Sequence, residues 1–161
     1  MIVELKGGQT QNLGAKLMLL ETARRLRAQF PNIQLAVRET PWLNHEARIA
    51  LGLIRKWPLR KRRIDLTRAA YYISPKLMSA VLGEDIVVES QLDAIVDLSG
   101  FAYGDRWGER ALFGAAAEIE RLSNHRKPYI FLPQAFGPFT KLGRASIERF
   151  SAALKIGRAH V

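Results

Sequence analysis

Glycine and polar residues gather in three short segments of the chain, each of which directly follows an apolar stretch. These segments are residues 7–12 (GGQTQN), 99–105 (SGFAYGD) and 133–139 (PQAFGPF). Glycine lets a ligand approach the backbone closely, and free amides at a helix start attract anions. The first segment, through Gly8 and the Asn12–Gly14 junction, therefore has the residue types that hold a sugar or an anionic substrate, although Asn12 is equally suited to cap a helix.

Two side chains in the other segments have chemistry of their own. Asp105 stands where a helix is expected to begin, so its carboxylate either caps that helix or acts as a general base that orients a sugar hydroxyl. Gln134 follows an apolar stretch, where an amide can hydrogen-bond a ligand. We expect Asp105 to be the catalytic carboxylate. The expected substrate-binding residues are Gly8, Asn12, Gly14, Tyr103, Asp105, Gln134 and Gly137.

Several other kinds of site are excluded by what the sequence lacks. There is no P-loop and no Gly-x-Gly-x-x-Gly dinucleotide fingerprint. The absence of cysteine excludes a thiolate metal site and a cysteine nucleophile. His45 and His125 have no partner at metal-ligand spacing. We therefore expect no metal.

The elements that must position these segments alternate along the chain. Strands are expected at 2–6, 33–37, 94–98 and 127–132, and helices at 13–30, 106–125 and 142–154. This alternation predicts an α/β fold, a Rossmann-like open parallel sheet with helices on both faces. Because parallel strands deliver their following loops to one edge, the three segments should meet there. Between residues 43 and 88 the pattern is weaker: we expect a helix at 43–56, a basic loop at 57–63, helical content at 65–82 interrupted at Pro75, and a short strand at 86–88.

The formal charge of +10 is partly concentrated in one basic cluster, formed by Arg55, Lys56, Arg60, Lys61, Arg62 and Arg63. We interpret the cluster as a solvated loop that folding does not require. It is also the part of the chain suited to peripheral contact with an anionic membrane surface. No nucleic-acid partner is expected, since the cluster lacks a helical face and a series of stacking aromatic residues.

Three motifs resemble those of the polysaccharide pyruvyl transferase family. Asn12–Leu19 is similar to the family's early helix start, Asp93–Asp105 to its central strand and glycine loop, and Pro133–Phe139 to its Gln-Ser-x-Gly-Pro-Phe turn. The resemblance implies a GT-B-like architecture of two domains. It also implies transfer of a pyruvyl ketal group from phosphoenolpyruvate, with no cofactor, to a sugar of a cell-surface or exopolysaccharide precursor. The donor-binding residues would lie in the family's carboxyl-terminal half.

The expected organisation follows from this resemblance and from the end of the chain. Residues 156–161 resemble the translation of a sequencing adapter, so we expect residues 1–155 to form the amino-terminal domain of a larger enzyme and to be inactive alone. No targeting or membrane segment is visible, and a cytoplasmic location is expected. Two alternatives remain: a GT-B-like glycosyltransferase that uses a nucleotide sugar, and a non-enzymatic binding module for acidic polymers.

Overall fold

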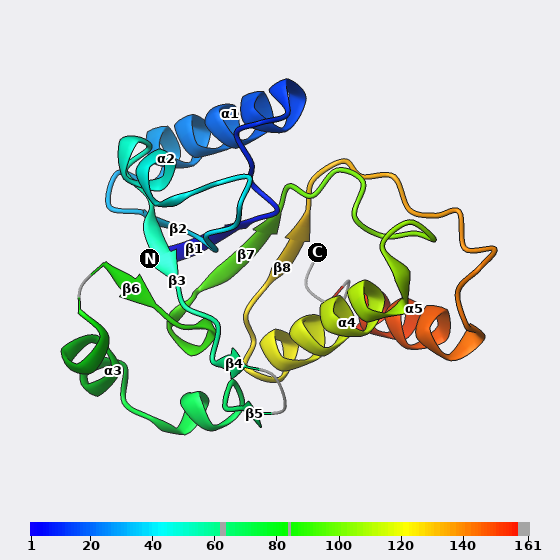
Figure 1. Cartoon of the computed structure of the whole chain (residues 1–161). Coiled ribbons are helices and arrows are strands. Elements are labelled where there is room, and N and C mark those ends of the chain that lie inside the picture. Colours follow the sequence, from blue (N-terminus) through cyan, green and yellow to red (C-terminus); the bar gives the residue numbers. More distant parts are fainter. Residues whose placement is uncertain (62–63, 84, 158–161) are drawn as a thin grey trace.

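The computed structural model of the protein describes residues 1–61, 64–83 and 85–157 (Figure 1). Six parallel strands form one open sheet, which confirms the expected α/β, Rossmann-like fold. In sheet order the strands are β6 (Ile86–Val87), β3 (Ile54–Lys56), β2 (Gln34–Val37), β1 (Ile2–Lys6), β7 (Ala94–Asp97) and β8 (Tyr129–Phe131). The first strand therefore lies in the middle of the sheet, between β2 and β7.

Helices cover both faces of this sheet, as the alternation of elements predicts. On one face lie α1 (Leu13–Gln29) and α2 (His45–Ala50), and on the other lie α4 (Gly108–Asn124) and α5 (Arg144–Gly157) (Figure 1). Asn12 caps α1 as expected, because its side-chain oxygen accepts a hydrogen bond of 3.1 Å from the amide of Ala15. The short helix α3 (Pro75–Leu82) lies beside β6 at the sheet edge (Figure 1). None of the described helices is long and apolar enough to cross a membrane.

The two faces of the sheet differ in polarity. Side chains alternate along each strand, and those directed toward α1, such as Val3 and Leu5, belong to an apolar core with Leu19 of the helix. The face toward α4 is apolar only in part: Ile2 and Ile95 pack with Leu122 of α4. Nearer the carboxyl ends of the strands, the same face bears buried charged groups: Glu4, Lys56 and Asp97, with Lys6 partly buried beside them.

The middle of the chain departs from the expected elements. The helix expected at 43–56 covers only His45–Ala50. The helix is capped by Leu51 and followed by Gly52, whose φ of +60° is a left-handed conformation that terminates helices. The chain then enters β3 and pairs with β2. Pro75 opens α3 at its first turn, so the break expected there is confirmed.

The basic segment expected as a loop forms an antiparallel hairpin of β4 (Arg60–Lys61) and β5 (Ile64–Asp65). The interpretation of a solvated cluster was wrong for Arg55 and Lys56. The guanidinium of Arg55 lies 3.1 Å from the Glu39 carboxylate, and Lys56 is 8% exposed and paired with two carboxylates. Arg60 fits the expectation, since its side chain is 65% exposed. Arg62 and Arg63 lie outside the described residues.

Candidate functional site

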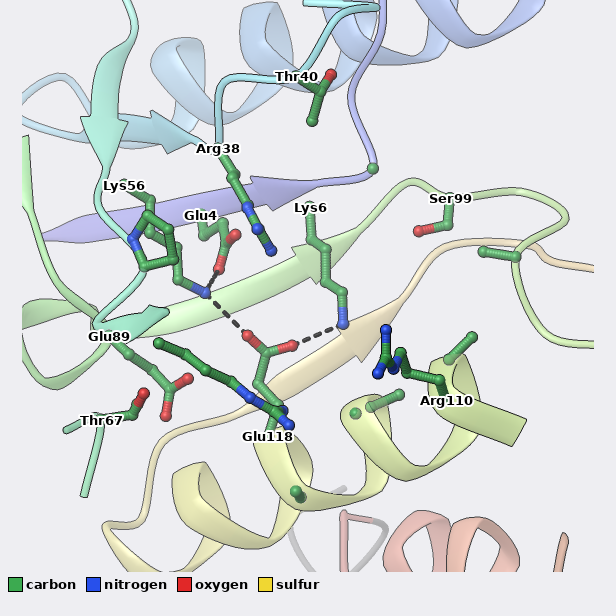
Figure 2. Close-up of a pocket in the computed structure, with 18 of the residues that line it drawn as sticks. Glu4, Lys6, Arg38, Thr40, Lys56, Thr67, Glu89, Ser99, Arg110 and Glu118 are labelled. Atoms are coloured by element: carbon green, nitrogen blue, oxygen red, sulfur yellow. Dashed lines mark hydrogen bonds and ion pairs between the residues drawn. The ribbon is translucent and has the colours of Figure 1, made fainter. Parts of the chain in front are cut away.

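A cavity of about 540 Å³ lies between the carboxyl ends of the strands and helix α4 (Figure 2). Its walls come from β1, β3, the loops that follow β1, β2, β3 and β7, and one side of α4. The β4–β5 hairpin and the turn that follows β6 complete them. In open α/β sheets, ligands bind at this edge, because the strand-following loops and helix starts meet there. The cavity is therefore the first candidate for a substrate site.

Its floor is a network of buried charges that joins the sheet to α4 (Figure 2). The ammonium of Lys56 lies 2.5 Å from the Glu4 carboxylate and 2.8 Å from that of Glu118. The second oxygen of Glu118 accepts a hydrogen bond of 2.6 Å from Lys6. Glu118 thus spans two lysines that come from two different strands.

The two carboxyl groups of the network have opposite pKa shifts. Burial disfavours the charged form of Glu118, but the attraction of Lys6 and Lys56 outweighs it and holds the pKa of Glu118 well below its usual range. Burial raises the pKa of Glu4 above its usual value, because Lys56 alone is close enough to oppose it strongly. Glu4 is therefore the member of the network that depends most on a single partner.

Asp97 extends the network beneath Lys6. Its carboxylate accepts hydrogen bonds of 2.5 Å from the Tyr103 hydroxyl and 2.6 Å from the Tyr129 hydroxyl. Lys6 also donates to Tyr129 at 2.7 Å and lies 4.0 Å from Asp97. The ammonium of Lys6 is thereby held in one place, facing the cavity (Figure 2).

The two lysines and the two tyrosines of this network share one direction of pKa shift. Burial alone would lower the pKa of Lys6 and Lys56, but the surrounding carboxylates outweigh it, and both pKa values are raised. Burial raises the pKa of Tyr103 and Tyr129, and neighbouring carboxylates add to the effect. A group that holds its proton more tightly when folded stabilises the fold fully below its unfolded pKa, and this contribution is lost as the pH rises through the folded pKa.

We therefore expect the melting temperature to stay level to about pH 9 and to fall steadily above about pH 10, where unfolded Tyr and Lys begin to titrate. Thermal unfolding followed by circular dichroism across this range measures the effect. Tyr129→Phe should flatten the alkaline fall, whereas Tyr72→Phe, at a 90% exposed position, should leave it unchanged. A wild-type melting temperature that stays constant to about pH 11 would contradict the raised pKa values.

Space in the cavity depends on small residues of α4, and its rim carries large aromatic ones. Ala111, Gly114, Ala115 and Ala117 line the helix side, and a Cβ at Gly114 would meet no atom within 4 Å. All three tryptophans of the chain line the cavity while 41–51% exposed: Trp42, Trp57 and Trp107. Exposed indoles gathered around one hollow are typical of a ligand site, since such rings are otherwise largely buried.

The three glycine-bearing segments meet at this edge, as the parallel sheet predicts. Gly7, with a φ of +76°, lies directly against Ser99, so that an added Cβ would meet the Ser99 backbone. The amide of Ala135 donates to the carbonyl of Gly100 at 3.0 Å, and that of Gly137 donates to the carbonyl of Tyr103 at 2.7 Å. The residues expected to bind substrate therefore share one region of the fold.

Only part of that predicted set lines the cavity itself. Gly8 and Tyr103 are in the wall. Asn12 caps α1, and Gly14 lies in the first turn of that helix. The amide nitrogen of Gln134 donates to the carbonyl of Asp97 at 3.0 Å, and within the described structure its oxygen is buried without a hydrogen-bond partner.

Asp105 lies beyond the cavity wall, where it organises the approach to α5. Its carboxylate accepts hydrogen bonds from the Thr140 hydroxyl at 2.6 Å, the Thr140 amide at 3.0 Å and the Lys141 amide at 2.9 Å. The hydrogen bonds from Thr140, followed by that from Lys141, lower the pKa of Asp105. These bonds use both carboxylate oxygens, and its role as catalytic carboxylate stays a prediction.

The residues that sequence reasoning missed are the charges of the floor: Glu4, Lys6, Lys56, Asp97 and Glu118. Charged residues in central strands of a sheet covered on both faces are uncommon, so Glu4, Lys6 and Asp97 carried a signal of their own. Glu118 lies between Ala115 and Leu122 on the apolar side of α4. Among the described residues, no three His, Cys, Asp or Glu side chains gather as metal ligands.

Comparison with known proteins bears on the same region of the chain. The family model for polysaccharide pyruvyl transferase matches residues 12–152. Neither the curated proteins nor the solved structures contain a match to the chain. The family match spans the segments 99–105 and 133–139 in full and includes only the last residue, Asn12, of the first segment; it covers most of the 161 residues. The Rossmann-like domain and its tryptophan-rimmed cavity thus belong to a member of the polysaccharide pyruvyl transferase family.

Proposed function

We propose that this protein takes part in transfer of a pyruvyl group from phosphoenolpyruvate to a sugar of a cell-surface or exopolysaccharide precursor in the cytoplasm. Two sugar hydroxyl oxygens become bonded to C2 of the donor, in place of the phosphate oxygen and of the π bond between C2 and C3. One hydroxyl oxygen bonds to C2 and gives up its proton, while the C2–C3 π bond breaks and a proton is added to the methylene carbon, which becomes a methyl group. The C2–O bond to phosphate then breaks, the second hydroxyl oxygen bonds to C2, and its proton leaves with inorganic phosphate. The product is a cyclic ketal.

The observation that carries the proposal is the cavity at the carboxyl edge of a domain matched to this family. A sugar offers apolar C–H faces and hydroxyls, and the cavity offers indole faces together with polar groups. The hydroxyls of Thr40 and Ser99 and the backbone of Gly7 and Gly8 are in its wall. We assign this cavity to the acceptor.

Within this assignment, Gly8 and Tyr103 contact the acceptor directly. Asn12, Gly14, Gln134 and Gly137 shape the loops around it, and Asp105 would reach a sugar that extends beyond the cavity. As the family resemblance implies, a second α/β domain would hold phosphoenolpyruvate across the opening, so that this domain alone binds acceptor without turnover. No separate cofactor is needed, because phosphoenolpyruvate supplies the carbon skeleton and the leaving group.

Filling the cavity at Gly114 tests this assignment. In the two-domain enzyme that the family resemblance implies, Gly114→Leu should lower the rate of ketal formation at least about tenfold, because the added side chain displaces the acceptor. Stability should not fall, since leucine is a better helix former than glycine by roughly half a kcal/mol or more. The measurement is release of phosphate together with the mass gained by the saccharide.

Gly114→Ala is the matched control, because a methyl group occupies little of the cavity while giving the same helix benefit. It should retain most of the rate. Equal rates in Gly114→Leu and wild type would place the acceptor elsewhere.

A further inference from the structure

The charges around the cavity do not balance, and the imbalance rests on two arginines. Of the described residues in its wall, six are basic and four are acidic. Each acidic group faces a basic one: Glu4 and Glu118 pair with lysines, Glu89 with Arg121, and Asp65 lies 3.8 Å from Arg60. Within the described structure, no carboxylate lies within 4.0 Å of Arg38 or Arg110.

These two arginines face the same space from opposite sides. Arg38 follows β2 and Arg110 belongs to the first turn of α4. Figure 2 shows both guanidinium groups directed toward the Glu4–Lys56–Glu118–Lys6 network, Arg38 from above it in this view and Arg110 from beside Lys6. The charge of Lys6 is already compensated by Glu118 and Asp97, so the floor is not the place where a further anion is held.

We infer that Arg38 and Arg110 form a phosphate-binding subsite within the cavity. The inference rests on the proposed function and deepens it by naming an anionic group on the ligand. A guanidinium presents a planar fork of donors that matches phosphate oxygens, and two such forks can share one phosphate group. Because Trp107 also lines this wall, three residues before Arg110 in the sequence, a sugar joined to that phosphate would lie against the indoles.

A phosphate can reach this subsite from either of two sources. One is a saccharide acceptor that is carried on phosphate, and the other is phosphoenolpyruvate itself. The two sources share the chemistry that the arginines recognise, and they differ in whether a sugar ring accompanies the phosphate.

Isothermal titration calorimetry on the purified chain tests the subsite without requiring turnover. The probes are glucose 1-phosphate, phosphoenolpyruvate, inorganic phosphate and glucose. At least one of the two phosphate esters should bind, more weakly as salt is raised. Arg38→Gln and Arg110→Gln should each weaken that binding about tenfold or more, as expected for loss of one charge-assisted contact. Arg144→Gln is the control, since that side chain is 91% exposed on α5, outside the cavity.

The possible results of the titrations distinguish the phosphate subsite from the proposed function. Arginine-dependent binding that is tighter for glucose 1-phosphate assigns the phosphate to the acceptor, and tighter binding of phosphoenolpyruvate assigns it to the donor; either supports the subsite. If neither ester binds, or if both arginine variants bind as the wild type does while remaining folded by circular dichroism, the subsite is wrong. If the two-domain enzyme forms no ketal from phosphoenolpyruvate while the purified chain keeps its arginine-dependent phosphate binding, the proposed function is overturned and the subsite stands.

Discussion

Replacing Lys56 by methionine should lower the free energy of unfolding by about 3–5 kcal/mol, the usual cost of removing one partner from a buried ion pair. Lys56 is 8% exposed, and its ammonium lies between two buried carboxylates. Glu118 would keep Lys6, but Glu4 would lose the cation 2.5 Å away and remain buried. The expected loss is therefore mainly the cost of leaving Glu4 without its partner. Urea denaturation of wild type and variant measures it.

Two control variants make this result specific. Arg60→Gln removes a basic residue from the same segment, but its exposed side chain lies 3.8 Å from Asp65, so the change should stay within about half a kcal/mol. Replacing both Glu4 and Lys56 by methionine should recover most of the loss, because the unpaired charge is gone. A cost for Lys56→Met no larger than that for Arg60→Gln would show that the cluster is a solvated loop after all.

Gly104→Ala should lower the free energy of unfolding by about 3 kcal/mol, the upper end of the range for forcing an extra carbon into a packed site. A Cβ on Gly104 would lie 2.5 Å from the carbonyl oxygen of Gly137 and 2.8 Å from its carbon. Both are backbone atoms, so no side-chain rotation relieves the contact. The loops at 99–105 and 133–139 must separate, which breaks the hydrogen bonds from the amide of Gly137 to Tyr103 and from the amide of Asp105 to Pro138.

The consequence should extend to the cavity, because Tyr103 belongs to the displaced loop and its hydroxyl binds Asp97. We expect Gly104→Ala to lower the melting temperature and to weaken ligand binding together. Gly114→Ala is the matched comparison: its Cβ has open space, and the change should raise the free energy of unfolding by about 0.5–1 kcal/mol. Equal stability of the two alanine variants would mean that the loops are not held in contact at Gly104.

Most strands and helices of this domain could be predicted, because the sequence patterns that indicate them involve residues close in sequence. The apolar strands at 2–6 and 94–98, the cap at Asn12 and the long stripe of α4 each depend on residues close in sequence. From these and from the common direction of parallel strands, the meeting of the three glycine-bearing segments followed. The middle of the chain was harder, because β3 and β6 have three and two residues and pair only through long-range contacts.

The charged residues in the floor of the cavity were not predicted as site residues, because their partners are also distant in sequence. Lys56 finds its partners 52 and 62 residues away, and nothing in the basic run around it distinguishes this lysine from exposed neighbours. The sequence of β1 does carry a signal. Glu4 and Lys6 occupy alternate positions of a strand that is central and covered on both faces, so both must find buried partners. Glu118, in the apolar stripe of α4, meets the same requirement.

The central claim is that the cavity between the sheet edge and α4 receives the saccharide acceptor, and its tryptophans provide the most direct measurement. The chain contains three tryptophans, and all of them line this cavity, so every indole N–H signal in a two-dimensional ¹⁵N–¹H spectrum reports on it. Titration with an acceptor oligosaccharide should shift these signals saturably in the wild type and much less in Gly114→Leu. Saturable binding that leaves all the indole signals in place, or that shifts them equally in Gly114→Leu, would contradict the assignment.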